Sequence, residues 1–207
     1  MISPCSGVIR SRVTCCCESL CTLGVGMPNN SNVRSQNYCI LRALQRCMHC
    51  TKPTPVLGVI LPAGHETLEA DAEVSDRLSA GDVWEIAPAG ALLFFVEYVP
   101  LTVQNRLHEL SQYYRFDHCE QAGQSLWMNH CSSCGKQIAD FEVYCEPEGA
   151  FSPISQEKAA SIQLHEVQEP FEAQAAGYSY APDFLGYVQR SGGAAGAPNL
   201  LRHNGKK

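Results

Sequence analysis

Two Cys-x-x-Cys steps limit how this chain can fold more than any other part of its sequence. They are Cys47/Cys50 and Cys131/Cys134, and eighty residues lie between them. Two such steps supply the four thiolates that a tetrahedral zinc ion binds, provided that the fold brings both turns together. The sequence therefore predicts one structural Zn²⁺, held by Cys47, Cys50, Cys131 and Cys134. A closed four-cysteine site leaves no coordination position for a substrate, so it predicts a metal without indicating an activity.

The residue after each step differs in how well it suits a metal-binding turn. Gly135 directly follows the second step, at a place where the backbone of such a turn takes a positive φ. Thr51 occupies the equivalent place after the first step. We therefore expect the first turn to be the less regular of the two.

Segments with the pattern of β-strands flank both steps. A β-branched, apolar run at residues 56–61 follows the first step. Residues 126–129 lead into the second step, and apolar and polar side chains alternate over residues 138–144 after it. Each step is thus expected at the tip of a β-hairpin.

This order of turn, strand, long excursion, strand and turn resembles the zinc-ribbon class. The stretch from about Tyr38 to Phe151 also resembles uncharacterised bacterial proteins that share two further features. One is a Thr-Pro-Val step after the first Cys-x-x-Cys, here residues 54–56, and the other is an Asn-His-Cys-x-x-Cys-Gly step, here residues 129–135. The resemblance implies a bacterial protein with bound zinc. It implies no activity, so no catalytic residue follows from it.

The expected fold is an α+β domain over residues 38–189, with a mainly antiparallel sheet and one or two helices inserted between zinc-ribbon-like knuckles. Residues 83–87 and 92–99 are expected strands, and the second is apolar on both faces at its start, which is typical of a central strand. Apolar residues recurring at intervals of four, three and four predict a helix over residues 101–114. Residues 162–167 are expected to form an edge strand.

The two ends of the chain are expected to lie outside this domain. Residues 1–37 are interpreted as a disordered leader, or a misassigned start before Met27, followed by a polar linker. A targeting segment and an extra metal-binding tract are the alternatives for residues 1–26. Residues 190–207 are rich in glycine and basic residues, which predicts a disordered tail.

Charge is unevenly distributed along the chain. Residues 1–60 carry six Lys and Arg against one acid, residues 61–189 carry five against twenty, and residues 190–207 carry four against none. An acidic middle disfavours the binding of nucleic-acid phosphates over most of the fold. The charge pattern therefore favours a protein partner of unknown identity over nucleic acid.

A nucleic-acid partner remains the alternative because basic residues cluster at the first step. Arg42, Arg46 and Lys52 lie on either side of it, and Tyr38 is close enough in sequence to offer a ring for stacking.

Cysteine usage indicates a reducing compartment, since residues 51–118 contain no cysteine, and the expected location is the cytoplasm. No run of 18 apolar residues occurs, so no membrane-spanning helix is expected.

Three other residues compete for places in the metal site. His49 lies inside the first step, His130 directly precedes the second, and Cys119 lies between the steps. An imidazole can replace a thiolate on zinc, but a residue inside such a turn usually points outward. Cys119 has no second cysteine at chelating spacing, which favours an ordinary, partly buried thiol.

The sequence favours a non-catalytic role over an enzyme. It contains no phosphate-binding glycine loop, no His-Glu-x-x-His and no nucleophile elbow. Asp140 and Glu142 are interpreted as the solvated face of a strand. A thiol redox protein is a lesser alternative, because a redox Cys-x-x-Cys opens a helix and neither step here precedes a convincing one. The favoured interpretation is a zinc-binding module with a protein-interaction role.

Overall fold

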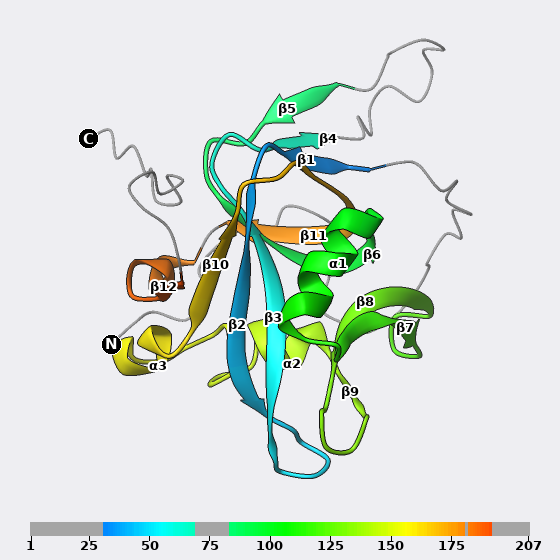
Figure 1. Cartoon of the computed structure of the whole chain (residues 1–207), viewed down its shortest axis with the longest axis vertical. Coiled ribbons are helices and arrows are strands. Elements are labelled where there is room, and N and C mark those ends of the chain that lie inside the picture. The colour runs from blue at the N-terminus through cyan, green and yellow to red at the C-terminus, as the bar shows by residue number, and fades with distance from the viewer. Residues whose placement is uncertain (1–30, 69–82, 181, 192–207) are drawn as a thin grey trace.

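The computed structural model of the protein describes residues 31–68, 83–180 and 182–191 (Figure 1). Twelve strands of these residues form one sheet. The strands are β1 (Val33–Ser35), β2 (Tyr38–Arg46), β3 (Pro53–Leu61), β4 (Glu66–Leu68), β5 (Trp84–Ile86), β6 (Ala91–Tyr98), β7 (Tyr114–Cys119), β8 (Gln124–His130), β9 (Gln137–Ile138), β10 (Gln163–Val167), β11 (Phe171–Tyr180) and β12 (Gln189–Ser191).

The sheet follows the order β12-β10-β2-β3-β6-β11-β1-β4-β5, and a side branch runs from β6 through β8 to β7 and β9. Every pairing is antiparallel except the parallel pair β10 and β12. The longest pairing is the hairpin of β2 and β3, which runs from Cys39 opposite Ile60 to Arg46 opposite Pro53. This hairpin and the β8–β9 hairpin carry the two Cys-x-x-Cys turns.

Three short α-helices and one 3₁₀ helix occur among the described residues. They are α1 (Leu101–Leu110), α2 (Asp140–Tyr144), α3 (Gln156–Ala160) and η1 (Asp183–Gly186). Val103 and Leu107 of α1 pack into one of the two main hydrophobic clusters, and Val143 and Tyr144 of α2 pack into the other. The two helices therefore help to cover different hydrophobic clusters of one sheet.

Side chains of β2 and β3 alternate between these two clusters. On β3, Leu57, Val59 and Leu61 pack into the cluster with α1, whereas Val56 and Ile60 pack into the cluster with α2. Because successive side chains of a strand point to opposite faces, a strand buried on both faces is apolar throughout. The apolar run at residues 56–61 is explained by this double burial.

The α+β expectation is wrong, because the protein is mainly β. The sheet is also not an insertion between two knuckles. Strands β1, β10, β11 and β12 lie outside the stretch that links the knuckles, and two of them pair directly with strands inside it, β1 with β4 and β11 with β6. Antiparallel pairing of β11 with β6 and of β10 with β2 joins these segments into one sheet, which short-range patterns could not reveal.

Two of the expected local elements also differ from the structure. The expected strand over residues 138–144 is only β9, followed by α2, because the buried residues are Asp140, Val143 and Tyr144. That spacing of three and four is helical, so the apparent alternation was misleading. The helix expected over residues 101–114 ends at Leu110, and Tyr114 begins β7.

The expected domain boundaries lie close to the ends of the sheet. β1 falls inside the expected linker before residue 38, where Val33 is buried against the core. β12 continues to Ser191, just past the boundary expected at residue 189. The expected leader at residues 1–26 and the expected tail from residue 192 onward lie outside the described residues. Residues 162–167 do form a strand, β10, but it is not an edge, since β12 and β2 flank it.

Candidate metal centre

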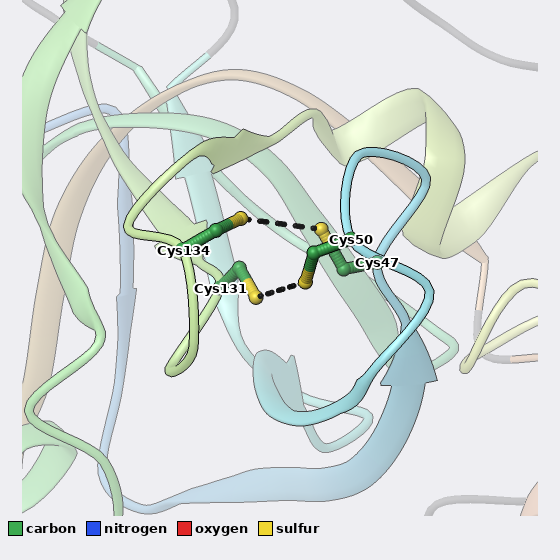
Figure 2. A group of neighbouring side chains, drawn as sticks. All are labelled: Cys47, Cys50, Cys131 and Cys134. Carbon is green, nitrogen blue, oxygen red and sulfur yellow. Dashed lines mark hydrogen bonds between the residues drawn. The ribbon is translucent and has the colours of Figure 1, made fainter.

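The fold brings the four expected cysteines together (Figure 2). Cys47 and Cys50 lie in the turn between β2 and β3, and Cys131 and Cys134 lie in the turn between β8 and β9. All four Sγ atoms lie within 4.8 Å of one another. The Sγ atoms of Cys47 and Cys134 are 3.7 Å apart, and those of Cys50 and Cys131 are 3.5 Å apart. Each of these two contacts joins one turn to the other.

The two turns share one pattern of backbone hydrogen bonds. In the first, Cys47 N–H donates to the carbonyl of Lys52, and Thr51 N–H donates to the carbonyl of Cys47. In the second, Cys131 N–H donates to the carbonyl of Lys136, and Gly135 N–H donates to the carbonyl of Cys131. The bonds are 2.8–3.0 Å long in both turns. The turns are therefore equivalent knuckles, named below knuckle 1 (residues 47–52) and knuckle 2 (residues 131–136).

The same left-handed backbone occurs at the same place in each knuckle. Gly135 has φ 72°, as the sequence indicates, and Thr51 has φ 61°. A β-branched residue is rarely found in this region because its side chain crowds the backbone. Knuckle 1 thus keeps the regular turn at a conformational cost, and its geometry is as regular as that of knuckle 2.

The spacing of the sulfur atoms fits a tetrahedral metal. Four sulfurs bonded to a central Zn²⁺ at about 2.3 Å would lie about 3.8 Å from one another. The two measured contacts, 3.5 and 3.7 Å, are close to that value. Cys47 and Cys131 are buried, Cys50 is half-buried and Cys134 is exposed. Four thiols at this spacing constitute a donor set that zinc prefers.

The packed thiols influence one another's ionisation. Burial raises the pKa of Cys131. The backbone N–H groups of Cys134 and Ser133 and the neighbouring thiols outweigh burial and lower this pKa to about 6. The backbone N–H of Lys52 lowers the pKa of Cys50, but burial and the three other thiols outweigh it and raise that pKa to about 11. Loss of the first proton from the cluster is therefore favoured, whereas loss of the next proton is opposed. A divalent cation supplies the positive charge that full deprotonation of such a cluster requires.

Two buried side chains attach β3 to knuckle 2 and to the strand before it. Thr54 of β3 accepts a 2.8 Å hydrogen bond at Oγ1 from the backbone N–H of Ser132, and its hydroxyl lies 3.1 Å from that of Ser132. Asn129 of β8 accepts from the N–H of Leu57 at 2.8 Å and donates to the carbonyl of Leu57 at 2.9 Å. Thr54 and Asn129 are almost completely buried. They fix the relative position of the two knuckles.

The sequence patterns did not predict Thr54 and Asn129 as site residues, although both belong to the two motifs that accompany the cysteines. Thr54 opens the Thr-Pro-Val step, and Asn129 opens the Asn-His-Cys-x-x-Cys-Gly step. Ser132, which bonds to Thr54, lies inside the second motif. The available signal was an asparagine at the end of an apolar strand pattern, directly before the second step. If such an amide is buried, it requires hydrogen-bond partners.

The competing residues lie outside the four-thiol cluster. His49 is exposed. His130 is fully buried, and its ring contacts the carboxylate of Asp117 at 3.0 Å through Nε2 and backbone carbonyls through Nδ1. Cys119 packs with Leu126 and Met128 in a separate small hydrophobic cluster. Burial raises the pKa of Cys39 to about 12, which is typical of an inert core thiol.

The acids near knuckle 2 differ from the solvated pair expected. Asp140 is buried at the start of α2 and accepts a 2.7 Å hydrogen bond from the backbone N–H of Phe95. Burial raises the pKa of Asp140 to about 6, although the Phe95 N–H opposes this. Glu142 accepts from the N–H of Ala139 and caps the same helix. Both carboxylates therefore have structural roles.

Only some of the residues expected to contact nucleic acid are exposed to solvent. Arg46 and Lys52 are exposed, but Arg46 also donates to the carbonyl of Thr51 and so supports knuckle 1. Arg42 is half-buried and bonds to Gln163 of β10. Tyr38 is buried against Phe171, so its ring offers no surface for a base.

Comparisons of the chain with protein-family models, with curated proteins and with solved structures found no match. None of the helices described here combines the length and the apolar character needed to cross a membrane.

Proposed function

We propose that the protein is a non-catalytic zinc-binding module in which Cys47, Cys50, Cys131 and Cys134 bind one structural Zn²⁺. The observation that carries this proposal is the convergence of four Sγ atoms within 4.8 Å from two knuckles with the same hydrogen bonds. Four protein ligands complete a tetrahedral zinc site and leave no position for a substrate. The zinc-ribbon resemblance stays a prediction, as do the bacterial source and the cytoplasmic location.

The site is tested by replacing zinc with Co²⁺, which absorbs visible light when four thiolates surround it. We expect the wild-type protein to bind one Co²⁺ per chain with the spectrum of a tetrahedral tetrathiolate, and one Zn²⁺ to displace it. Cys131→Ser should lose this spectrum and lower the melting temperature, whereas Cys119→Ser, which changes a thiol outside the cluster, should keep it. An unchanged spectrum in Cys131→Ser would remove Cys131 from the ligand set.

The proposed biological role is to bind a protein partner at the knuckle end of the molecule. Leu44 of β2 is 70% exposed and Met48 of knuckle 1 is 72% exposed. Large exposed apolar side chains beside basic Arg46 and Lys52 support contact with another protein. The closed metal site would keep knuckle 1 in a fixed shape for such contact.

Nucleic-acid binding is retained as the second candidate because Lys52 and Arg46 are exposed beside knuckle 1. If that role is correct, affinity for a single-stranded DNA oligomer should fall steeply with added salt and drop in Lys52→Ala. Leu44→Ser should weaken a protein complex and leave DNA binding unchanged. Recovery of a partner that persists after nuclease treatment and is lost in Leu44→Ser would favour the protein-interaction role.

A further inference from the structure

The pairing of sulfur atoms in the metal centre crosses from one knuckle to the other. The 3.5 Å contact joins Cys50 to Cys131, and the 3.7 Å contact joins Cys47 to Cys134. Figure 2 shows both contacts as dashed lines between the two turns. In a redox-active Cys-x-x-Cys motif the disulfide forms within the step, so this arrangement predicts a different pairing.

Each of these pairs combines a buried cysteine with a more exposed one. Cys134 is exposed and its neighbour Cys47 is buried, while Cys50 is half-buried and its neighbour Cys131 is buried. An accessible cysteine next to a second thiol is the arrangement found where a thiol is oxidised and then resolved as a disulfide. Each pair therefore offers one exposed or half-buried cysteine to an oxidant and one buried cysteine that can resolve it.

Contacts other than the metal hold the two knuckles in register. Thr54 bonds to Ser132, and Asn129 bonds to Leu57. None of these four residues is a proposed zinc ligand, so the contacts between them do not require zinc. The thiols would consequently stay close to their partners across the site while zinc is leaving it, which favours bond formation between knuckles over separation of the hairpins.

We propose that the metal centre is also a modification site for a small hydroperoxide, which oxidises the four thiols to two disulfides between the knuckles, Cys50–Cys131 and Cys47–Cys134, and expels zinc. The proposal rests on the zinc site of the proposed function. In each pair the accessible thiolate attacks the peroxide oxygen, giving a sulfenic acid and one water. The buried thiolate then attacks that sulfur, and the oxygen leaves with protons from solvent as a second water.

The electrons balance with two peroxides for each metal centre. Each disulfide releases two electrons, which reduce one hydrogen peroxide to two waters. Four thiolates, two hydrogen peroxides and four protons therefore yield two disulfides and four waters, and the Zn²⁺ is released without a change of oxidation state. The disulfides would replace the metal as the link between the β2–β3 and β8–β9 hairpins, so the fold should survive the loss of zinc.

The test begins with the full-length protein purified in reductant, freed of excess reductant and analysed for zinc, which checks the proposed function separately. Hydrogen peroxide is then added in the presence of a chromogenic zinc chelator. We expect zinc release to end near two peroxides consumed per zinc. Mass spectrometry of an unreduced tryptic digest should find the peptide with Cys47 and Cys50 linked to the peptide with Cys131 and Cys134. Cys145→Ser, a change outside the cluster, should give the same linkage.

Paired variants distinguish the two possible connections between the knuckles. Cys47→Ser/Cys134→Ser leaves Cys50 and Cys131, which should form a disulfide at least tenfold faster than the mismatched Cys50 and Cys134 left by Cys47→Ser/Cys131→Ser. Circular dichroism of the oxidised wild-type protein provides a readout independent of the variants and should retain its β signal. Disulfides mainly within the steps, Cys47–Cys50 and Cys131–Cys134, would overturn the proposal, as would zinc that remains bound to the oxidised protein.

Discussion

Individual buried polar residues give the metal centre its shape. Asn129 replaces part of a missing strand pairing, because its amide meets both the N–H and the carbonyl of Leu57. β3 and β8 do not pair through backbone hydrogen bonds, so the side chain of Asn129 supplies the hydrogen bonds between these two strands. A buried group without its partner costs more than the bond itself contributes, so such residues tolerate little change.

Asn129→Ala should lower the free energy of unfolding by roughly 3 kcal/mol, because it leaves two buried backbone groups without partners. Chemical denaturation of the zinc-loaded protein measures this change. Asn105→Ala, at an exposed position of α1, is the matched control and should stay within about 0.5 kcal/mol of wild type. Equal stability of the two variants would contradict the role given to Asn129.

Asp140 should make stability depend on pH. Burial raises its folded-state pKa to about 6 from an ordinary value of 3.8, so the folded protein holds a proton that the unfolded chain has lost. Stability should therefore fall as pH rises from about 4 to about 6 and change little above that. Asp140→Asn removes this loss and should be more stable than wild type at pH 7 by on the order of 3 kcal/mol, but not at pH 4.

Thermal denaturation across this pH range measures the difference between Asp140→Asn and wild type. Glu66→Gln provides a control of opposite sign, because a hydrogen bond from Arg34 lowers the pKa of Glu66. That variant should lose stability relative to wild type as pH rises to just above 4.5, the ordinary pKa of a glutamate. A pH-independent difference for Asp140→Asn would show that its carboxyl titrates normally.

At the scale of elements, two hairpins with equivalent turns build the metal centre. Gly135 and the apolar run at residues 56–61 carried a local signal for the second turn and for the strand after the first. The local pattern failed at α2, where alternation over residues 138–144 imitated a strand and the buried residues were Asp140, Val143 and Tyr144. The burial of a carboxylate is decided by the distant Phe95 N–H, which no local pattern contains.

The left-handed residues of the knuckles should respond in opposite directions to substitution. Thr51→Asn replaces a β-branched residue at φ 61° by one that tolerates this region, and should stabilise the protein by up to about 1 kcal/mol. Gly135→Ala should destabilise it by about 1 kcal/mol through backbone strain alone, because a Cβ there meets no atom within 4 Å. Melting temperatures in reductant with zinc would compare them, and a destabilised Thr51→Asn would contradict the strain at knuckle 1.

At the scale of the whole molecule, the sheet was the least predictable feature. β11 pairs with β6 and with β1, and β10 pairs with β2, although these strands are far apart in sequence. Such pairings depend on the complete set of strands competing for each edge, so the short-range patterns that found the cysteines could not find the mainly β fold. The cysteine cluster was easier to find, because each turn carries two thiols at the fixed local spacing that suits a metal ion.

Bound zinc should contribute to the stability of the whole molecule. A link between residues 50 and 131 closes a loop of about 80 residues, for which the loss of chain entropy in the unfolded state is worth roughly 4 kcal/mol. Chelation of zinc in reductant should therefore lower the melting temperature by several degrees, and Zn²⁺ should restore it. A melting temperature indifferent to chelation would argue that the sheet alone sets the stability.

The most direct test of the central claim is the metal content of the protein purified in reductant without added chelator. Elemental analysis against protein concentration should find one zinc per chain in the wild-type protein and well under one in Cys131→Ser. Cys119→Ser should keep the full content, because its thiol lies in a separate hydrophobic cluster. Well under one zinc per wild-type chain would contradict the assignment of the four cysteines as a zinc site.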